Sequence, residues 1–474
     1  MFSHALRVLF ILLEVVVLFN LLIVVHELGH FLAARWRGLF IEKFGVWFGK
    51  PLWKKTINGV QYSLGSIPFG GFVALPQLAP MDIIEGKADV DRAKLPPISA
   101  LDKIIVAVAG PLFSLLLALF FACVVWAVGH PVSESDLTTV IGYVEKDSPA
   151  EKAGLLPGDK ILEVDGKPVT RFSGMNDSVV WNVLRSEEPT VPFKIERGGK
   201  VLTVSVTPIK SVTSGWRRKS VRQVMILPAQ TALIDKVQPD TPAAAAGLKH
   251  GDVVTGFNGT RIYHPVALAE FIEAHPNEPV VLQVNRDGAV SEVTVQPKIL
   301  KGEKTARIGI QWEANGRMSV AHPQPLEQVY NSVTSTINTI SAVASPKSDV
   351  KLQHLSGPIG IGRIYYLLFQ SDNGWQLALW FSVILNVNLA ILNMLPIPVL
   401  DGGHIVLAII ESFRRKPVNI RILEVIQTGC AVLIIGYMLY VTFYDAQDLP
   451  FIRNKLDKMD SQSAPAKPSP GTSP

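Results

Sequence analysis

The sequence contains little cysteine and few charged residues. Its 474 residues include two cysteines, Cys123 and Cys430, and both lie inside apolar runs, which argues against a disulfide framework. Charged residues make up 18% of the chain and hydrophobic residues 48%, which is apolar for a soluble protein. The formal net charge of +5 is small and gives no reason to expect a nucleic acid as partner. The composition predicts several membrane spans with soluble segments between them.

Four apolar stretches are long enough to cross a bilayer, which takes about 20 residues. They are residues 6–34, 104–128, 375–395 and 423–443. The first starts next to the N-terminus without an A-x-A-like cleavage site, so we expect a retained span and not a signal peptide. Lysine and arginine gather in the loops 35–100 and 404–422, and the positive-inside rule therefore places both loops in the cytoplasm and residues 130–374 outside.

The first span ends in the pattern His26-Glu27-Leu28-Gly29-His30, an H-E-x-x-H sequence. Residues four apart lie on one face of a helix, so His26 and His30 can offer two imidazole nitrogens to one Zn²⁺. Glu27 lies about 100° round the helix, where its carboxylate can take a proton from a water without ligating the metal. Such a pattern also occurs on ordinary solvated helix faces. At the end of an apolar run ionisable groups are costly, and this favours the metal site.

Zinc held by two histidines needs a third protein ligand and leaves one position open. We expect Asp401, in the segment NMLPIPVLDGGH that follows the third span, because that span places it at the same cytoplasmic end as the histidines. His404 is the competing ligand. Asn393 and Asn388 are amides near the end of the same span and could hold a substrate backbone or an oxyanion. The alternative for these amides is hydrogen bonding between helices.

The loop after the first span is rich in glycine and aromatic residues and carries the hairpin signal Asn58-Gly59. We expect short β-hairpins over residues 40–76, in or near the membrane face. An edge strand near residues 60–73 could then pair with an extended substrate. An ordinary cytoplasmic loop is the alternative.

The outer segment contains an internal repeat. Residues 148–155, SPAEKAGL, recur 93 positions later as TPAAAAGL, and the dipeptide Gly158-Asp159 recurs as Gly251-Asp252. The repeated pattern S/T-P-A-x-x-A-G-L-x-x-G-D resembles the PDZ domain in its bacterial arrangement. That resemblance implies a barrel that binds extended peptides by strand addition, and a spacer with an unused groove is the alternative. Residues 325–345 predict an amphipathic helix on the membrane surface or against the second copy.

The sequence therefore predicts a polytopic α-helical membrane protein. It has four transmembrane helices, two tandem periplasmic PDZ-like domains that are mixed α/β barrels, and a membrane-associated β-hairpin region. The expected segments are the first transmembrane helix 1–37, the β-hairpin region and connector 38–100, the second transmembrane helix 101–130, the PDZ-like domains 131–212 and 213–300, the amphipathic helix and loop 301–373, the third transmembrane helix 374–396, the cytoplasmic loop 397–422, the fourth transmembrane helix 423–445 and a disordered tail 446–474.

These motifs together resemble the site-2 protease family of intramembrane zinc metalloproteases, in the branch of the bacterial regulator-of-sigma-E proteases. The resemblance rests on HELGH in the first span, AGP in the second, the tandem repeat, and N-x-x-P-x-P-x-L-D-G-G at the third. It implies that Glu27 is the general base and that Asn393 contacts the substrate. It also implies that the zinc ligands are His26, His30 and Asp401. The family pattern A-G-P-x-x-N departs here, because Ser114 stands where the amide is expected.

The resemblance also implies the substrates and the location. The substrates are single-span membrane proteins of the anti-sigma factor type, already cut outside, and remnant signal peptides. The protein is expected as a multi-pass protein of the bacterial inner membrane, in contact with the lipid bilayer. The basic loops place its active site toward the cytoplasm and the PDZ-like domains in the periplasm. From that placement, on the opposite side from the zinc site, we expect these domains to gate substrate access. A catalytically inactive PDZ scaffold is the first alternative, although a scaffold has no need of Glu27. A metal transporter would need more ionisable groups in its spans.

Overall fold

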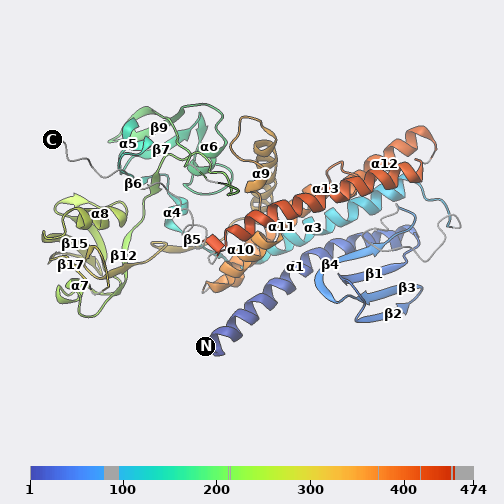
Figure 1. Cartoon of the computed structure of the whole chain (residues 1–474), viewed down its shortest axis with the longest axis horizontal. Coiled ribbons are helices and arrows are strands. Elements are labelled where there is room, and N and C mark those ends of the chain that lie inside the picture. The colour runs from blue at the N-terminus through green and yellow to red at the C-terminus, as the bar shows by residue number, and fades with distance from the viewer. Residues whose placement is uncertain are drawn as a thin grey trace.

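The structure is a computed structural model that describes residues 2–78, 95–211, 213, 215–300, 302–371, 373–416, 418–449 and 452–453. This part of the chain contains four long apolar helices (Figure 1). They are α1 (Phe2–Arg37), α3 (Ala100–Val128), α11 (Gly374–Asn393) and α13 (Ile420–Gln447). Each overlaps one predicted span, and each is long and apolar enough to cross a membrane.

Helix α3 is the centre of the bundle and contacts α1, α11 and the short helix α12 (Asp401–Arg414). It begins with a capping box, in which the Ser99 hydroxyl accepts from the N–H of Asp102 and the Asp102 carboxylate accepts from the N–H of Ser99. Farther along, Ala118 and Ala122 are fully buried against α1 and α11. Small side chains let helix backbones approach closely, which is how packing is achieved between membrane helices.

The glycine-rich loop forms one four-stranded sheet beside the C-terminal half of α1 (Figure 1). Its strands are β1 (Lys43–Phe48), β2 (Trp53–Ile57), β3 (Val60–Leu64) and β4 (Ile67–Ala74), in the order β2-β3-β1-β4. The predicted hairpin at Asn58-Gly59 is confirmed, since both residues have positive φ and join the paired strands β2 and β3. Strand β4 is an edge strand that packs against α1.

The two sequence repeats fold into two domains, called here the first and the second copy. Their elements follow in the same order, except that the second copy has two additional short strands before its last one. The first copy contains β6 (Ile141–Val144), α5 (Pro149–Ala153), β7 (Lys160–Val164), β8 (Lys167–Pro168), α6 (Val179–Arg185), β9 (Val191–Arg197), β10 (Lys200–Val206) and β11 (Ile226–Pro228). The second copy contains β12 (Ala232–Val237), α7 (Pro242–Ala245), β13 (Val253–Phe257), β14 (Thr260–Arg261), α8 (Val266–Ala274), β15 (Val280–Arg286), β16 (Ala289–Val295), β17 (Lys298–Ile299), β18 (Ala306–Arg307) and β19 (Ile310–Trp312).

The repeated Gly-Asp dipeptide has a structural role in both copies. Asp159 accepts two hydrogen bonds from Arg197, and Asp252 accepts two from Arg286 in the same way. Each carboxylate also accepts a backbone N–H three residues earlier in the chain. The hydrogen bonds from the Arg286 guanidinium lower the pKa of Asp252. The repeat therefore reflects a bridge that ties one loop of each copy to its central sheet.

The predicted boundary between the copies, at residues 212 and 213, is wrong. The first copy continues to Pro228, because β11 pairs with β6 and Val224 lies in the core of this copy. The second copy likewise continues past residue 300, because β19 pairs with β12 and Ile308 is buried in its core. In each copy the last strand returns to pair with the first one after a connection that has no repeated sequence signal.

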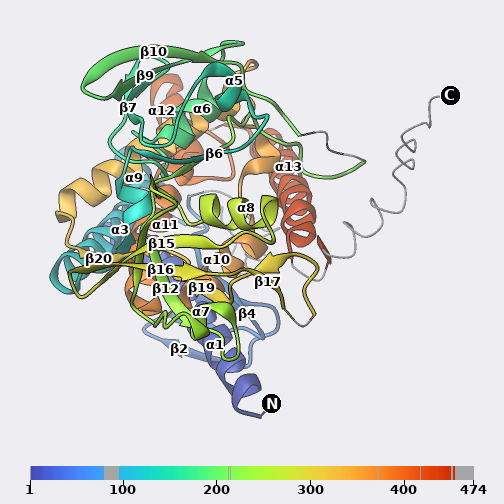
Figure 2. The same cartoon turned by 90° about the vertical axis from the view of Figure 1, so that its left-hand side faces the viewer.

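The chain enters and leaves the two copies through one short ribbon. Strand β5 (His130–Ser133) follows α3 and pairs antiparallel with β20 (Met318–Ala321), which precedes α9 (Pro325–Ala344). A short helix α4 (Glu134–Leu137) leads from β5 into the first copy. Both copies therefore lie at one end of the helix bundle, whereas α12 and the β1–β4 sheet lie toward the other end (Figure 1). Seen from the end that carries them, the copies lie in front of the middle of the bundle, and α13 is visible beside them (Figure 2).

The predicted amphipathic helix is present as α9, which lies between the first copy and the bundle. Gln328 donates to the carbonyl of Ala122 on α3, and Asn176 of the first copy donates to the carbonyl of Asn331. These contacts link α9 to the first copy, whereas the sequence pointed to the membrane surface or the second copy. The 3₁₀ turn η2 (Leu352–His354) and α10 (Pro358–Gln370) lead on to α11.

The C-terminal tail was predicted to be disordered from residue 446. Helix α13 ends at Gln447, and residues 454–474 lie outside the described part of the chain.

Candidate metal centre

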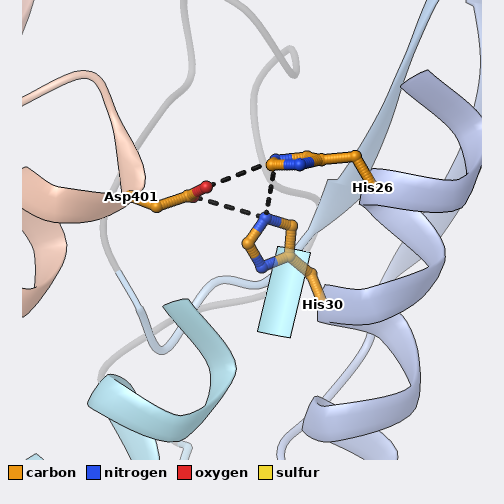
Figure 3. A group of neighbouring side chains, drawn as sticks. All are labelled: His26, His30 and Asp401. Carbon is orange, nitrogen blue, oxygen red and sulfur yellow. Dashed lines mark hydrogen bonds and ion pairs between the residues drawn. The ribbon is translucent and has the colours of Figure 1, made fainter. Parts of the chain in front are cut away.

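Three side chains from two distant parts of the sequence converge between α1 and α12 (Figure 3). His26 and His30 lie one turn apart near the end of α1, and Asp401 is the first residue of α12. The two Nε2 atoms are 3.3 Å apart. The Asp401 carboxylate oxygens lie 3.2 Å from Nε2 of His26 and 3.3 Å from Nε2 of His30. The two nitrogens and the carboxylate group, which faces each nitrogen with a different oxygen, are therefore the three corners of one ligand triangle.

This triangle has the dimensions of a zinc site. Tetrahedral ligands that are each about 2.0–2.1 Å from a zinc ion lie about 3.3 Å from one another. Two imidazole nitrogens and one carboxylate oxygen are also a donor set that zinc accepts in catalytic sites, with a fourth position left open. Both histidines are buried. The group therefore differs from the exposed acidic clusters that are common on protein surfaces without a bound ion. The residues present thus fit a zinc ion.

The other ring nitrogen of each histidine is held by α3. The Nδ1 atom of His30 lies 2.8 Å from the carbonyl oxygen of Val106, so it must carry the proton and donate. The Nδ1 atom of His26 lies 3.0 Å from the hydroxyl oxygen of Ser114, which is fully buried. With Nδ1 donating, each Nε2 keeps its lone pair for a metal. Ser114, the position that departs from the family pattern, therefore orients one candidate ligand.

Glycine makes room for this arrangement at two helix contacts. A Cβ atom at Gly110 of α3 would lie 2.2 Å from Nε2 of His30, and one at Gly29 would lie 2.4 Å from the carbonyl oxygen of Ala109. The motif A-G-P is thus needed for α1 and α3 to approach at the histidines. At α12, Gly402 and Gly403 would collide with backbone carbonyls of residues 394–397 if either carried a side chain. That close packing fixes the start of α12 and the position of Asp401.

The structure brings Asp401, and not His404, to the two histidines. His404 lies one turn further along α12, is buried and lines the same cavity, but it is outside the group of converging ligand atoms found among the described residues. Its Nδ1 atom has no hydrogen-bond partner within the described structure.

A cavity of about 340 Å³ opens beside the three side chains. The glutamate of the motif, Glu27, lines it and does not belong to the ligand triangle. Strand β4 passes close to this glutamate, since a Cβ atom at Gly71 would lie 3.5 Å from the Cγ atom of Glu27. Residues 69–73 of β4 form the opposite wall. The edge strand expected near residues 60–73 is therefore beside the candidate base.

The two asparagines of α11 lie in different places. Asn393, the last residue of the helix, lines the cavity, and its Nδ2 atom is 3.3 Å from Nε2 of His26. Asn388 is not among the residues that line the cavity and accepts a hydrogen bond from the Thr336 hydroxyl of α9. Of the two, only Asn393 therefore lines the cavity at the candidate metal centre, and Asn388 joins two helices.

Sequence reasoning missed one residue that shapes the cavity. Asn20 of α1 donates to the carbonyl of Pro68, at the start of β4, over 3.1 Å. About two helical turns further along α1 this strand reaches Glu27, so Asn20 helps to fix the cavity wall. A single amide inside the apolar run of residues 15–25 was the signal, since a polar group there needs a partner.

Comparison with known proteins gives a consistent result. The chain matches the family model for peptidase family M50 over residues 14–436. It is 28% identical to a Vibrio cholerae protein provisionally named a zinc metalloprotease, over 91% of this chain and 97% of that protein. It is 27% identical to the regulator of sigma-E protease RseP of Escherichia coli K12, over 91% and 97%. The corresponding Salmonella typhi protein is also 27% identical, over 90% and 97%. A PDZ domain from Listeria innocua covers 18% of this chain and 94% of its own at 20% identity, but with a TM-score of 0.17 this likeness does not decide the fold of either copy.

Proposed function

Because the chain belongs to peptidase family M50 and is a metalloprotease of the site-2 type, we propose that it hydrolyses peptide bonds inside the membrane at the His26–His30–Asp401 centre. The observation that carries the proposal is the ligand triangle together with Glu27, which lines the same cavity without being one of the ligands. A PDZ scaffold without catalytic activity is the competing function. A scaffold would not require this triangle, nor a cavity that joins it to an edge strand.

The residues have separate roles in this proposal. His26, His30 and Asp401 would hold zinc, which when bound polarises a peptide carbonyl and acidifies a water molecule. Glu27 takes the proton of the attacking water and delivers it to the amine nitrogen that leaves as the C–N bond breaks. Asn393, at the C-terminal end of α11, donates its amide hydrogens to the substrate carbonyl oxygen, where negative charge develops.

The substrate is proposed to bind as an extended strand along β4. A transmembrane helix hides its carbonyls in intrahelical hydrogen bonds, so it must unwind before it can be cut. In hydrocarbon the freed backbone groups then need new partners. The free edge of β4, whose residues 70–73 line the cavity, offers a row of N–H and C=O groups for this purpose.

The substrates we propose are single-span membrane proteins of the anti-sigma factor type, first cut outside, and remnant signal peptides. The relatives named regulator of sigma-E protease support this class. The four spans and these relatives support a place in the bacterial inner membrane. We further propose that the metal centre lies toward the cytoplasm and that the two copies, as PDZ-like domains, lie in the periplasm and gate access.

Replacing Asp401 by alanine should remove zinc and activity together. The carboxylate supplies one of three ligand atoms, and two imidazoles alone leave the site incomplete. We expect purified Asp401→Ala protein to have lost its stoichiometric zinc, measured by elemental analysis, and to leave a model transmembrane substrate uncut. His404→Ala is the matched control, because it removes a cavity residue of the same helix and should retain zinc. If Asp401→Ala keeps both zinc and activity while His404→Ala loses the metal, the ligand assignment must be exchanged.

The proposed orientation can be tested by thiol labelling. Single cysteines would replace the exposed residues Ser205, Ser291 and Ser412, in a chain whose Cys123 and Cys430 are changed to serine. An impermeant thiol reagent applied to cells with an opened outer membrane should label positions 205 and 291, in the two copies, and leave position 412 of α12 unlabelled. Lysing the cells should make position 412 reactive. Labelling confined to position 412 in intact cells would reverse the orientation.

A further inference from the structure

A segment of the first copy reaches away from its domain toward the helix bundle. After β10 the chain leaves the first copy, and it returns at Val224, just before β11. The two sides of this excursion meet at the antiparallel bridge between Ile209 and Gln223, and its tip carries the sequence GWRRK, residues 215–219. Here it is called the arm. Neither the proteolytic chemistry nor the repeat pattern gives the arm a role.

The arm is fastened to the outer end of α13. Arg218 forms ion pairs with Asp445 and Asp448, at 3.1 and 3.3 Å. Gln447 donates to the backbone carbonyl of Trp216 over 3.1 Å. The Asp445 carboxylate is buried and also accepts backbone N–H groups at the start of α10. These contacts fix the height of the arm at the last turn of a helix that can span the membrane.

The side chains at the tip are left exposed although its backbone is fixed. The Trp216 side chain is 82% exposed, and Lys219 is exposed while its carbonyl is in contact with His354. Contiguous exposed apolar side chains are typical of surfaces that bind a partner or a membrane, whereas a single one needs no explanation. The neighbouring turns also expose apolar side chains, at Leu352 of η2 and Ile359 of α10.

The level of Trp216 along the membrane normal follows from α13. Phe443 is exposed on this helix and lies four residues before Gln447, or about 6 Å along the helix axis. Tryptophan and other aromatic side chains gather where the hydrocarbon meets the headgroups, and lysine reaches from there to the phosphates. The acidic and amide groups at positions 445–448 indicate that the hydrocarbon ends there. The Trp216 backbone, which is hydrogen-bonded to Gln447, therefore lies at the level where the hydrocarbon ends.

We propose that the arm is a membrane anchor. Trp216 inserts into the headgroup region of the leaflet that faces the two copies, and Lys219 contacts the phosphates of that leaflet. The first copy is thereby held at a fixed height above the bilayer by lipid as well as by α9 and α13. The inference depends on α13 as a span and not on the metal centre, so it goes beyond the proteolytic function and can fail independently of it.

Tryptophan fluorescence in vesicles tests the anchor. The full-length protein and its Trp216→Phe variant would be reconstituted in phosphatidylcholine–phosphatidylglycerol vesicles, with lipids brominated near the glycerol backbone or with unbrominated lipids. The difference between the two proteins isolates the emission of Trp216 among the nine tryptophans of the chain. We expect this difference signal to be quenched by the brominated lipid and to be protected from aqueous iodide.

The control moves the same fluorophore to the water-facing side of the first copy. A Val201→Trp substitution in the Trp216→Phe chain places an indole on the exposed face of β10. Its emission should be quenched by iodide and should be insensitive to the brominated lipid. If the Trp216 signal behaves like this control, the tip of the arm lies in water and the anchor does not exist. An unchanged far-ultraviolet circular dichroism spectrum in every variant shows that the comparison concerns folded protein, whether or not the metal centre is as proposed.

Discussion

Replacing Glu27 by glutamine should abolish peptide hydrolysis while the purified protein keeps its zinc. Glutamine has nearly the same shape but cannot accept the proton of the attacking water. General-base catalysis contributes about 10²–10⁴-fold to rate, so we expect cleavage of a model transmembrane substrate to fall by at least about 10²-fold. Zinc should remain because the Glu27 side chain is not among the converging ligand atoms. Cleavage assays and elemental analysis of the same preparation measure both quantities.

A second glutamate of the same helix provides the matched control. Glu14 lies on α1 but does not line the cavity beside the candidate zinc ligands. Glu14→Gln therefore removes a carboxylate from the first span without touching the proposed chemistry, and it should cleave like the parent protein. Full activity in Glu27→Gln would exclude a role as general base. Loss of zinc in that variant would instead indicate that Glu27 supports the metal site.

The sequence predicted those parts of the site whose geometry follows from the periodicity of a single helix. The spacing of His26 and His30 places two imidazoles on one face of α1 whatever the rest of the fold does. The same arithmetic separates the two asparagines of α11. Five residues at about 100° each put Asn388 and Asn393 about 140° apart, so both cannot face one cavity. In the structure Asn388 indeed points to α9 and Asn393 to His26.

Other features depend on contacts between distant segments and could not be derived from local patterns. The position of Asp401 is set by two glycines that pack on the carbonyls of residues 394–397. The end of the first copy is set by the pairing of β11 with β6, across more than 80 residues of sequence. The contact of α9 with the first copy passes through Asn176, a loop residue without any distinctive motif. An amphipathic pattern reveals that a helix has a partner, but not which one.

Deleting both copies should widen the range of substrates and leave the chemistry intact. No candidate metal ligand set was found within the described residues of 134–317. The copies cover one end of the bundle, and α12 with Asp401 lies toward the other (Figures 1 and 2). We therefore propose that they act as a size filter, which excludes substrates with a bulky outer domain and admits those already trimmed. A size filter requires no bound peptide, so it can work even if both grooves are unused.

The ribbon at the base of the copies shows where to cut the chain. Ser133 of β5 pairs with Met318 of β20, so the two strands end opposite each other once residues 134–317 are removed. An Asn-Gly turn between them would close a two-residue hairpin and preserve the ribbon. The deletion also removes the hydrogen bond from Asn176 to α9 and the ion pair from the arm to α13. Insertion and zinc content must therefore be measured together with cleavage.

The shortened protein should cut an untrimmed substrate as readily as a trimmed one, whereas the full-length chain should cut only the trimmed one. Introducing Glu27→Gln into the shortened protein must abolish both reactions, which attributes them to the same site. A shortened protein that inserts and binds zinc but cuts neither substrate would show that the copies deliver substrate or support the bundle. The same protein cutting only the trimmed substrate would place the size filter in the helices. Either result would end the gating proposal, because a gate must restrict access without contributing to the chemistry behind it.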